Sequence, residues 1–600
     1  MATSLTRVLS SSRLRAPAAL AAARRLPAAP LLFLLAALLV HATVLLHAAS
    51  AWIGEGGDAR IAVWYLGWIA DSVAHGHSPL ITDYLHYPDS INVMWNASVL
   101  LPGLLLTPVT LLAGPIAAYN VLVVGAVTLS SWTAYLALRR YVALAPAAWL
   151  GGALYGFSPF MVNASLGQVH MLLLWLPPLT LLLLDEALVR RRWSVRRTGT
   201  LLGAAAALQV VVAEEVLAIT VIGAAAGLAI LALQHRHRVA ERLGRLLRTA
   251  GVAAVVFAVL AAAPLALQFL GPGRPTAALF PGDWQVADAA GFVVPTAHQW
   301  IAPDAVRSLA PHFAAGIPEA PDNYLGLPLL LFVVGALALL LRNAAVRFAA
   351  ALGTVMAVLA MGQHLHRDAA ITNVVLPWRL ADSLPLLADL VPARLIVVTW
   401  LMAGLIVAVV VDQLLVHPTD SAPAGTPRAS PRRRAVLGGL ALTLALAPVV
   451  PALPLPDFTP ATPAYFSSAA VEAIPEGAPV LVLPFTPVFG ELAMSWQAEA
   501  HYRFRLLGGN AFSERPAAAL GQPSSLKAVV VDIEVAGRWH DVLDTATRAA
   551  LLGDLRRDHV AAVVLGPCPN EAHLLATFTD LLGPATQVEG GVHTWLLGPG

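Results

Sequence analysis

The feature that most constrains this chain is a series of long stretches that contain no Asp, Glu, Lys or Arg. Of its 600 residues only 12% are charged and 58% are hydrophobic, whereas a soluble globular protein carries about 25% charged residues. A helix needs about 20 apolar residues to cross the hydrocarbon core of a bilayer. The chain is therefore not a soluble enzyme, a disordered protein or a nucleic-acid-binding protein. We expect a polytopic α-helical membrane protein.

The charge-free stretches predict eleven transmembrane helices. A run at 99–113 is short and holds two prolines, so it is interpreted as a re-entrant or interfacial piece. The stretch 198–235 would make a helix about 57 Å long, so we expect a hairpin with Glu214 and Glu215 at its outer turn. The predicted spans lie near 30–48, 116–138, 144–162, 169–187, 198–213, 216–233, 250–270, 324–341, 346–362, 393–412 and 435–453.

Arginine positions predict the orientation, because cytoplasmic loops retain basic residues. The segments assigned to the inside hold 23 arginines, and the outer loops of the membrane domain hold six. The N-terminus is thus expected in the cytoplasm and the C-terminus outside the plasma membrane. A cleaved signal peptide over the first apolar run, with a site near 47–51, is the alternative for the start of the chain.

This map divides the chain into three parts. Residues 1–29 form a basic cytoplasmic N-terminus, and 30–454 form the transmembrane domain, with outer loops at 49–115, 271–323 and 363–392. Residues 455–600 are expected to be a small extracytoplasmic α/β domain with a largely buried sheet. Strands are predicted at 480–485, 528–532, 561–565 and 593–597, and a helix at 545–557.

Asp58 is the first candidate for chemistry. It lies in Glu55-Gly-Gly-Asp-Ala-Arg60, just after the first predicted span. Glycines beside a carboxylate allow another molecule to approach closely, and a general base needs an ionisable group within hydrogen-bond reach of its proton. The alternative is a solvated loop acid that helps to start the next helix.

The rest of the first outer loop mixes polar and aromatic residues. A helix over 61–74, with Trp64 and two further aromatic residues, is expected at the membrane surface, where aromatic residues are common in any membrane protein. Asp83 and His86 belong to a following polar and aromatic run. Such a run suits a sugar, whose hydroxyls accept and donate hydrogen bonds and whose faces stack on aromatic rings.

Four further charged residues lie at or near predicted spans. Glu214 and Glu215 interrupt an apolar stretch, which indicates function if they are in the membrane and an ordinary loop if they are at the outer turn. Arg379 and Arg394 are on the side where few arginines are expected. Each can bind a lipid phosphate through paired hydrogen bonds or extend to the interface without a ligand.

The sequence predicts no metal site. Cys568 is the single cysteine, which excludes a multi-cysteine centre. The pairs His75/His77 and His364/His366 lack a carboxylate at a fixed offset.

Several short motifs, in this order, resemble those of the GT-C superfamily of membrane glycosyltransferases, including bacterial YfhO-like and related multipass proteins. The similarity covers roughly 50–410, with a weaker echo in the tail. The motifs are Gly57-Asp-Ala-Arg60, Ala118-Tyr-Asn120, Tyr155-Gly-Phe-Ser-Pro159, Gly167-Gln-Val-His170, Ala213-Glu-Glu215, Tyr324-Leu-Gly326 and Met494-Ser-Trp-Gln497.

The resemblance implies a mechanism in which an acid of the first outer loop is the general base. A sugar passes with inversion from a polyprenyl-phosphate donor to a cell-envelope glycan, lipid or protein. Asp58 corresponds to the base, and Arg60, Arg379 and Arg394 are candidates for the lipid phosphate. Because the chain lacks an adjacent acid pair in this loop, Glu214 or Glu215 can complete the site. The same departure weakens the case for a divalent cation, which stays possible.

Two other classes of function remain open. A transporter or flippase usually shows internal repeats and polar residues at the midplane of broken helices, and this sequence shows no convincing repeat. A non-catalytic membrane scaffold with a partner-binding tail does not need an acid after the first helix. A hexosyl- or pentosyltransferase of the bacterial plasma membrane is the leading hypothesis.

Overall fold

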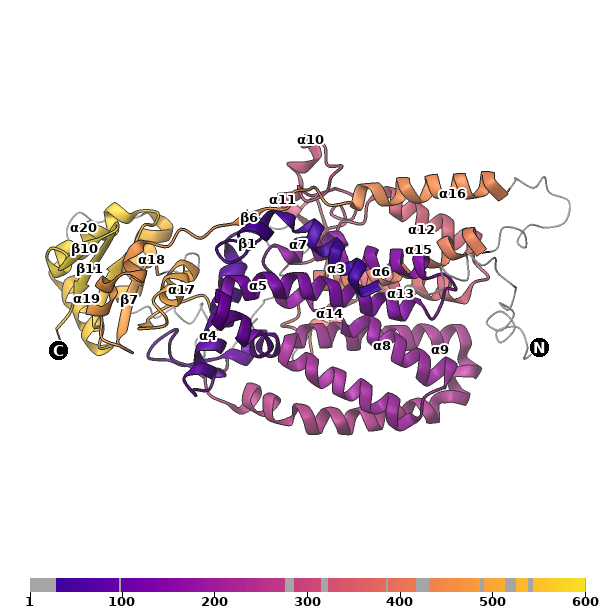
Figure 1. The fold of residues 1–600 in the computed structure, drawn as a ribbon, viewed down its shortest axis with the longest axis horizontal. Helices are drawn as coiled ribbons and strands as arrows, with labels where there is room; N and C mark the ends of the chain where they lie inside the picture. The colour runs from indigo at the N-terminus through magenta and orange to yellow at the C-terminus, as the bar shows by residue number, and fades with distance from the viewer. Residues whose placement is uncertain are drawn as a thin grey trace.

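The computed structural model describes residues 29–96, 99–275, 285–313, 322–384, 387–416, 431–485, 490–512, 525–537 and 543–598. The expected cytoplasmic N-terminus therefore lies almost wholly outside the described residues. Helices form an elongated bundle, and the strand-rich C-terminal part lies at one end of it (Figure 1). The fold class is the predicted one.

Five helical segments of the described chain are long and apolar enough to cross a membrane. Their boundaries agree with the predicted spans only in part, and the total of eleven crossings stays a prediction. The segments are Leu100–Leu138, Val169–Arg190, Val195–His237, Ala240–Leu270 and Pro392–Val416, with shorter apolar helices at Ala29–Val40, Leu327–Leu339, Ala344–Ala360 and Ala435–Val449.

The helical elements follow one another along the bundle. Its α-helices are α3 (Ala29–Val40), α4 (Gly57–Ala74), α5 (Leu100–Leu138), α6 (Ala145–Gly156), α7 (Pro159–Ser165), α8 (Leu176–Asp185), α9 (Val195–Leu270), α10 (Asp304–Arg307), α11 (Ala310–Phe313), α12 (Leu327–Leu339), α13 (Ala344–Ala360), α14 (Trp378–Asp382), α15 (Ile396–Val416) and α16 (Pro431–Leu446). Short 3-10 segments include η3 (Val169–Leu172) and η5 (Pro392–Leu395), and η4 (Glu186–Arg190) is a π-helix.

Helix α9 reverses direction, as the hairpin prediction requires. Its backbone leaves helical geometry at Ala213 and His235. Gly199 packs against Thr249 and Gly203 packs against Ala253, so the first and third arms run the same way. The middle arm, which connects them in the sequence, must then run in the opposite direction. Figure 1 shows the arms of α9 stacked beside α8. The break at Ala213 lies directly before Glu214.

Helix α5 joins the expected re-entrant piece to the following span. The two parts meet at Gly114, whose φ of 86° is in the left-handed region, and Pro115 follows. Glycine adopts this backbone geometry without steric cost, while proline lacks the N–H that would continue the ladder. The 100–113 segment is therefore one arm of a kinked helix.

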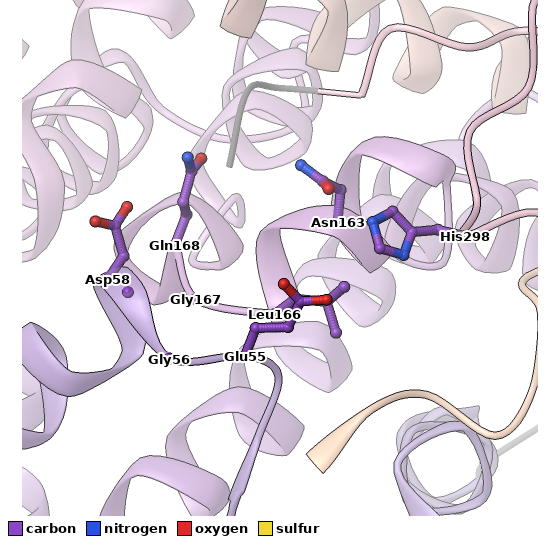
Figure 2. Close-up of a pocket in the computed structure, with 9 residues that line it drawn as sticks. Glu55, Gly56, Asp58, Asn163, Leu166, Gly167, Gln168 and His298 are labelled. Carbon is purple, nitrogen blue, oxygen red and sulfur yellow. The ribbon is translucent and has the colours of Figure 1, made fainter. Parts of the chain in front are cut away.

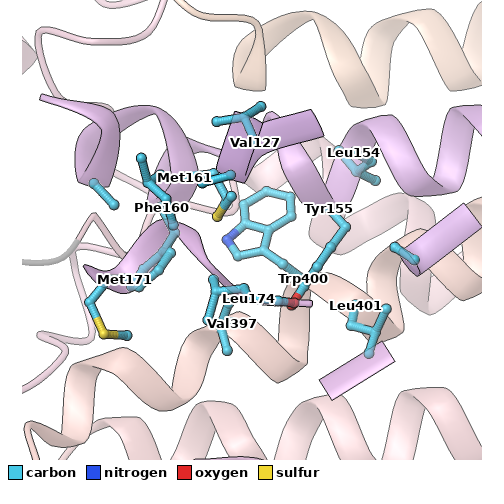
Figure 3. Packing of buried hydrophobic residues seen from close by; sticks show 14 of the residues in the cluster. Val127, Leu154, Tyr155, Phe160, Met161, Met171, Leu174, Val397, Trp400 and Leu401 are labelled. Atoms are coloured by element: carbon cyan, nitrogen blue, oxygen red, sulfur yellow. The ribbon is translucent and has the colours of Figure 1, made fainter. Parts of the chain in front are cut away.

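A cluster of buried apolar side chains surrounds Trp400 of α15. Figure 3 shows this indole between side chains of α5, α6 and α7, including Val127, Tyr155 and Phe160. The Tyr155 hydroxyl donates to the Leu174 carbonyl oxygen at 2.8 Å. This core fixes the start of α15 relative to the segment 158–174.

The C-terminal part contains a five-stranded mixed sheet in the order β10-β11-β9-β7-β8. Val480 and Val482 of β7 face one apolar cluster, and Leu481 and Leu483 face another, so the sheet is buried on both sides as predicted. The strands are β7 (Pro479–Leu483), β8 (Arg505–Leu506), β9 (Ala562–Leu565), β10 (Gln587–Glu589) and β11 (Val592–Leu596), with helices α17 (Gly490–Glu499), α18 (Ser525–Ala536), α19 (Thr545–Arg557) and α20 (Glu571–Leu582).

Three of the four predicted strands and the helix at 545–557 are present. The strand predicted at 528–532 is wrong, because this segment belongs to helix α18. Leu526, Val530 and Ile533 are buried at helical spacing. The three-part division of the chain stays a prediction. Short two-stranded pairs lie elsewhere: β1 (Trp52–Ile53) with β6 (Asp457–Phe458), β2 (Ile81–Thr82) with β3 (Ile91–Asn92), and β4 (His364–Arg367) with β5 (Ala370–Val375).

Helix α4 packs against the C-terminal part of the chain, and its place at the membrane surface stays a prediction. Trp64 is fully buried against the C-terminal part, where its indole N–H donates to Gln497 at 2.9 Å. The Tyr502 hydroxyl donates to the Trp64 carbonyl oxygen at 2.9 Å. Helix α4 lies where the helical bundle meets the C-terminal part (Figure 1). Its aromatic residues pack in one cluster with residues of the C-terminal part.

Candidate functional site

Asp58 lies in the first turn of α4, where the chain after β1 meets the loop after α7. The Glu55 N–H donates to the Leu166 carbonyl oxygen at 3.2 Å. Gly54 has φ of 105°, and a Cβ there would stand 2.2 Å from the same oxygen. Glycine is required at this position because the two backbones touch.

Asn120 of α5 holds the other side of this loop. Its side-chain oxygen accepts from the Ile53 N–H at 2.9 Å. Its side-chain nitrogen donates to the carbonyl oxygens of Ala48 and Ala51, at 2.9 and 2.8 Å. The carboxamide thus fixes the backbone that leads to Asp58.

A small polar cavity opens between these two loops (Figure 2). Asp58 and Gln168 border it on one side, and Asn163 and His298 lie on the other. The remaining lining comes from Glu55, Gly56, Gly57, Leu166 and Gly167. These side chains offer a carboxylate, amides and an imidazole, which can hydrogen-bond a hydroxylated ligand.

Two effects set the pKa of Asp58. Burial raises it above the usual value of 3.8, and the positive charge of Arg394 opposes that rise. Burial disfavours the charged carboxylate because water is lost around it. A raised pKa makes the carboxylate a stronger proton acceptor, which is what a general base needs.

Glu215 and Arg394 meet next to this carboxylate, although 178 residues separate them in the chain. They form an ion pair, and Glu215 also accepts from the Val391 N–H at 3.2 Å. Arg394 is 8% exposed. The structure therefore brings together three of the predicted site residues, Asp58, Glu215 and Arg394.

Glu214 turns toward different partners. Its carboxylate accepts from the Gln268 side-chain nitrogen at 3.1 Å, and this nitrogen also donates to the Met94 carbonyl oxygen at 3.2 Å. The Glu214 side chain is exposed on the surface of the chain and does not line the Asp58 cavity.

Arg60 and Arg379 do not line the cavity either. The Arg60 guanidinium stacks over the rings of Phe458 and Trp52, at 4.9 and 5.9 Å from their centres. Burial lowers the pKa of Arg60 below its usual range. Arg379 is exposed on the short helix α14.

Asp83 and His86 face the C-terminal part. Asp83 pairs with Arg505 at 3.4 Å, and the backbone N–H of His86 donates to the Gly508 carbonyl oxygen at 3.1 Å. Burial lowers the pKa of His86 to about 4, so the ring is neutral at pH 7. Neither residue lines the Asp58 cavity.

Sequence reasoning missed Asn163, Gln168 and His298 as site residues. The string Gly167-Gln-Val-His170 contains one of them, but it carried weight only as a resemblance. Asn163 comes from helix α7 and His298 from a loop, and neither has a distinctive spacing in the sequence. Among the residues that the structure describes, no group of three or more His, Cys, Asp or Glu can hold a metal ion.

Comparisons with known proteins identify structural neighbours only. No protein family profile and no curated protein matches the sequence. An Archaeoglobus fulgidus oligosaccharyltransferase aligns with a TM-score of 0.51 at 12% identity, covering 90% of this chain and 69% of the other. The mycobacterial arabinofuranosyltransferase AftD gives 0.49 at 18% identity, and ArnT from Cupriavidus metallidurans gives 0.44 at 12%.

The coverage of these neighbours differs. The alignment to ArnT takes in 94% of this chain and 97% of that protein. The alignment to AftD takes in 90% of this chain but about a third (35%) of AftD. The alignment to the oligosaccharyltransferase shows that this chain shares the fold of that protein. The closer likeness to YfhO-like proteins stays a prediction.

Proposed function

We propose that this protein is a membrane glycosyltransferase that moves a sugar from a polyprenyl-phosphate donor to a cell-envelope acceptor. The GT-C fold supports the proposal, because the neighbours named above are a membrane oligosaccharyltransferase, AftD and ArnT. The single observation that carries it is the half-buried carboxylate of Asp58 at the mouth of a polar cavity.

In the proposed reaction Asp58 removes the proton from an acceptor hydroxyl. The hydroxyl oxygen attacks the anomeric carbon of the donor sugar and forms the new glycosidic bond. The bond between that carbon and the phosphate oxygen breaks, and the polyprenyl phosphate leaves with the bonding electron pair. One displacement inverts the anomeric configuration.

Other residues have supporting roles in this proposal. Amide side chains at positions 163 and 168 hydrogen-bond sugar hydroxyls, since both line the cavity. Arg394 stabilises the leaving phosphate, as a guanidinium suits phosphate oxygens. The reaction is placed on the extracytoplasmic face of the bacterial plasma membrane, following the distribution of arginines.

The proposal is tested by incubating the purified protein with a set of radiolabelled undecaprenyl-phosphate sugars and a cell-envelope extract. We expect label to pass from at least one donor to the extract, with inverted configuration at the anomeric carbon. Transfer with retention would contradict the single-displacement step. A folded protein that transfers no label from any donor of the set would contradict the proposed activity.

A further inference from the structure

The ion pair between Glu215 and Arg394 is not part of the cavity lining, but the charge of Arg394 acts on the proposed base. Glu215 is in α9, two residues after the break at Ala213, and Arg394 is in η5 at the start of α15. Both hydrogen bonds that Glu215 accepts come from the segment 391–394, one from the guanidinium and one from a backbone N–H. The Glu215 carboxylate therefore fixes the backbone of the segment 391–394 as well as the guanidinium of Arg394.

The guanidinium of Arg394 has a hydrogen-bond donor that is not satisfied by the described residues. Its Nε–H is buried and has no hydrogen-bond partner among the described residues. A buried donor without an acceptor costs free energy, so this geometry is expected where a ligand supplies the missing oxygen. Asp58 is close enough for the charge of Arg394 to act on it.

We infer that Glu215 is a positioning residue that holds Arg394 beside Asp58 and leaves the Nε–H of Arg394 for a phosphate oxygen of the substrate. This inference rests on the proposed function. Glu215 is then neither the base nor a ligand of the substrate. Its negative charge compensates the buried positive charge of Arg394, which would otherwise be costly inside a bundle.

Among the described residues, Arg394 is the cation whose charge acts on Asp58, while the Arg60 guanidinium stacks on Phe458 and Trp52. The groups that act on Asp58 or on Arg394 are Tyr119 of α5, His170 of η3 and Glu215 of α9. The positive charge of Arg394 also acts on the imidazole of His170. Among these described groups Arg394 is the permanent positive charge, so its orientation decides where a phosphate can bind.

Binding of undecaprenyl phosphate to the purified full-length protein tests the inference. We expect Glu215→Gln and Arg394→Gln each to weaken binding at least about tenfold, since each breaks a buried charge pair. The double variant should be no weaker than the poorer single variant, because both act through one guanidinium. Glu215→Asp, which keeps the charge, should recover part of the affinity.

Glu186→Gln is the matched control, because it breaks another buried pair, with Arg140, at the far end of α5. It should lower thermal stability and leave undecaprenyl phosphate binding unchanged. A thermal-unfolding curve for each variant separates loss of folding from loss of binding. If Glu215→Gln fails to fold, Glu215→Asp and Arg394→Lys carry the test, and full affinity in both overturns the inference.

The pH dependence of transfer gives a second reading. Removing the charge of Arg394 takes away the effect that lowers the pKa of Asp58, so the acid limb of the rate should move to higher pH in Arg394→Gln. In Glu215→Gln the positive charge remains without its partner, so the limb should move to lower pH. A Glu215→Gln variant whose residual transfer no longer falls at acidic pH would show that Glu215 is itself the base.

Failure of the inference differs from failure of the proposed function. If the wild type neither binds undecaprenyl phosphate nor transfers sugar, the proposed function is wrong. If the wild type binds and Glu215→Gln binds equally well, or the two single effects add, only the positioning role is wrong.

Discussion

Two clusters of arginines and buried carboxylates lie at opposite ends of the helical bundle. Only one of them contains a carboxylate that forms no ion pair with an arginine of its own. At the first end Arg140 pairs with Glu186 and Arg190 pairs with Asp185 at 2.8 Å. Each carboxylate there has its own arginine. At the other end Arg394 pairs with Glu215, while Asp58 borders a cavity.

The distance between the clusters follows from α5. Tyr119 is near Asp58, and Arg140 follows the end of the same helix 21 residues later, about 30 Å along the axis. The first cluster is closed further by hydrogen bonds from Arg190 to the Arg140 carbonyl oxygen and from the Arg192 N–H to Glu186. We infer that the paired charges of the first cluster stabilise the fold, whereas the Asp58 carboxylate of the second cluster acts in the proposed reaction.

The largest expected effect is that of Asp58→Asn on transfer. The variant removes the general base, which typically contributes a factor of about 100 to 10,000 to a rate. We therefore expect transfer to fall at least about 100-fold, measured as initial rates with the donor that the wild type uses. Asp83→Asn is the matched control, since its side chain pairs with Arg505 away from the cavity; an equal loss in this control would remove the special status of Asp58.

Breaking the closed cluster should affect stability more than rate. Glu186 is fully buried, and removal of one partner of a buried ion pair costs about 3–5 kcal/mol. Glu186→Gln should lower the thermal unfolding temperature in detergent, while the folded fraction transfers sugar at the wild-type rate. An unfolding temperature equal to that of the wild type would show that this cluster does not stabilise the bundle.

Gly54→Ala tests the loop that presents Asp58. The added Cβ would meet the Leu166 carbonyl oxygen at 2.2 Å, in a backbone conformation that disfavours alanine. We expect a loss of about 1–3 kcal/mol in stability, the usual cost of strained backbone, and slower transfer because the loop shifts. Gly76→Ala is the control: that position also has positive φ but nothing within 4 Å, so it should keep full activity.

The smallest expected effect is the pH dependence of stability. Burial raises the pKa of Asp58 in the folded protein, so the folded state binds its proton more tightly than the unfolded state does. Stability is therefore lost as pH rises from the usual value of 3.8 through the raised pKa. Asp58→Asn should be slightly more stable than the wild type at neutral pH, and the difference should vanish in acid.

The sequence predicted the parts of the fold that local pattern determines. The charge-free stretches located the apolar helices in part, and the break in α9 follows from a stretch too long for one crossing. The strand predicted at 528–532 failed because β-branched residues outweighed the helical spacing of Leu526, Val530 and Ile533. The sequence did not predict that the aromatic residues of helix α4 pack on a part of the chain more than 400 residues away.

The candidate site was predictable residue by residue but not as an arrangement. Asp58 was identified from its glycine neighbours and its place after the first span. Glu215 and Arg394 were identified singly as charges near apolar stretches, but their pairing depends on how α9 packs against α15. Asn163, Gln168 and His298 are ordinary polar residues in sequence. They become neighbours only because helix α7 and the loop after it meet the loop that holds His298.

The most direct test compares Asp58→Asn and Glu186→Gln side by side, measuring transfer rate and thermal unfolding temperature for both. The comparison of the two clusters predicts opposite results: Asp58→Asn loses transfer and keeps or gains stability, and Glu186→Gln loses stability and keeps transfer. If both variants lose transfer and stability together, or Asp58→Asn transfers sugar normally, the division between a closed structural cluster and an open chemical one is wrong.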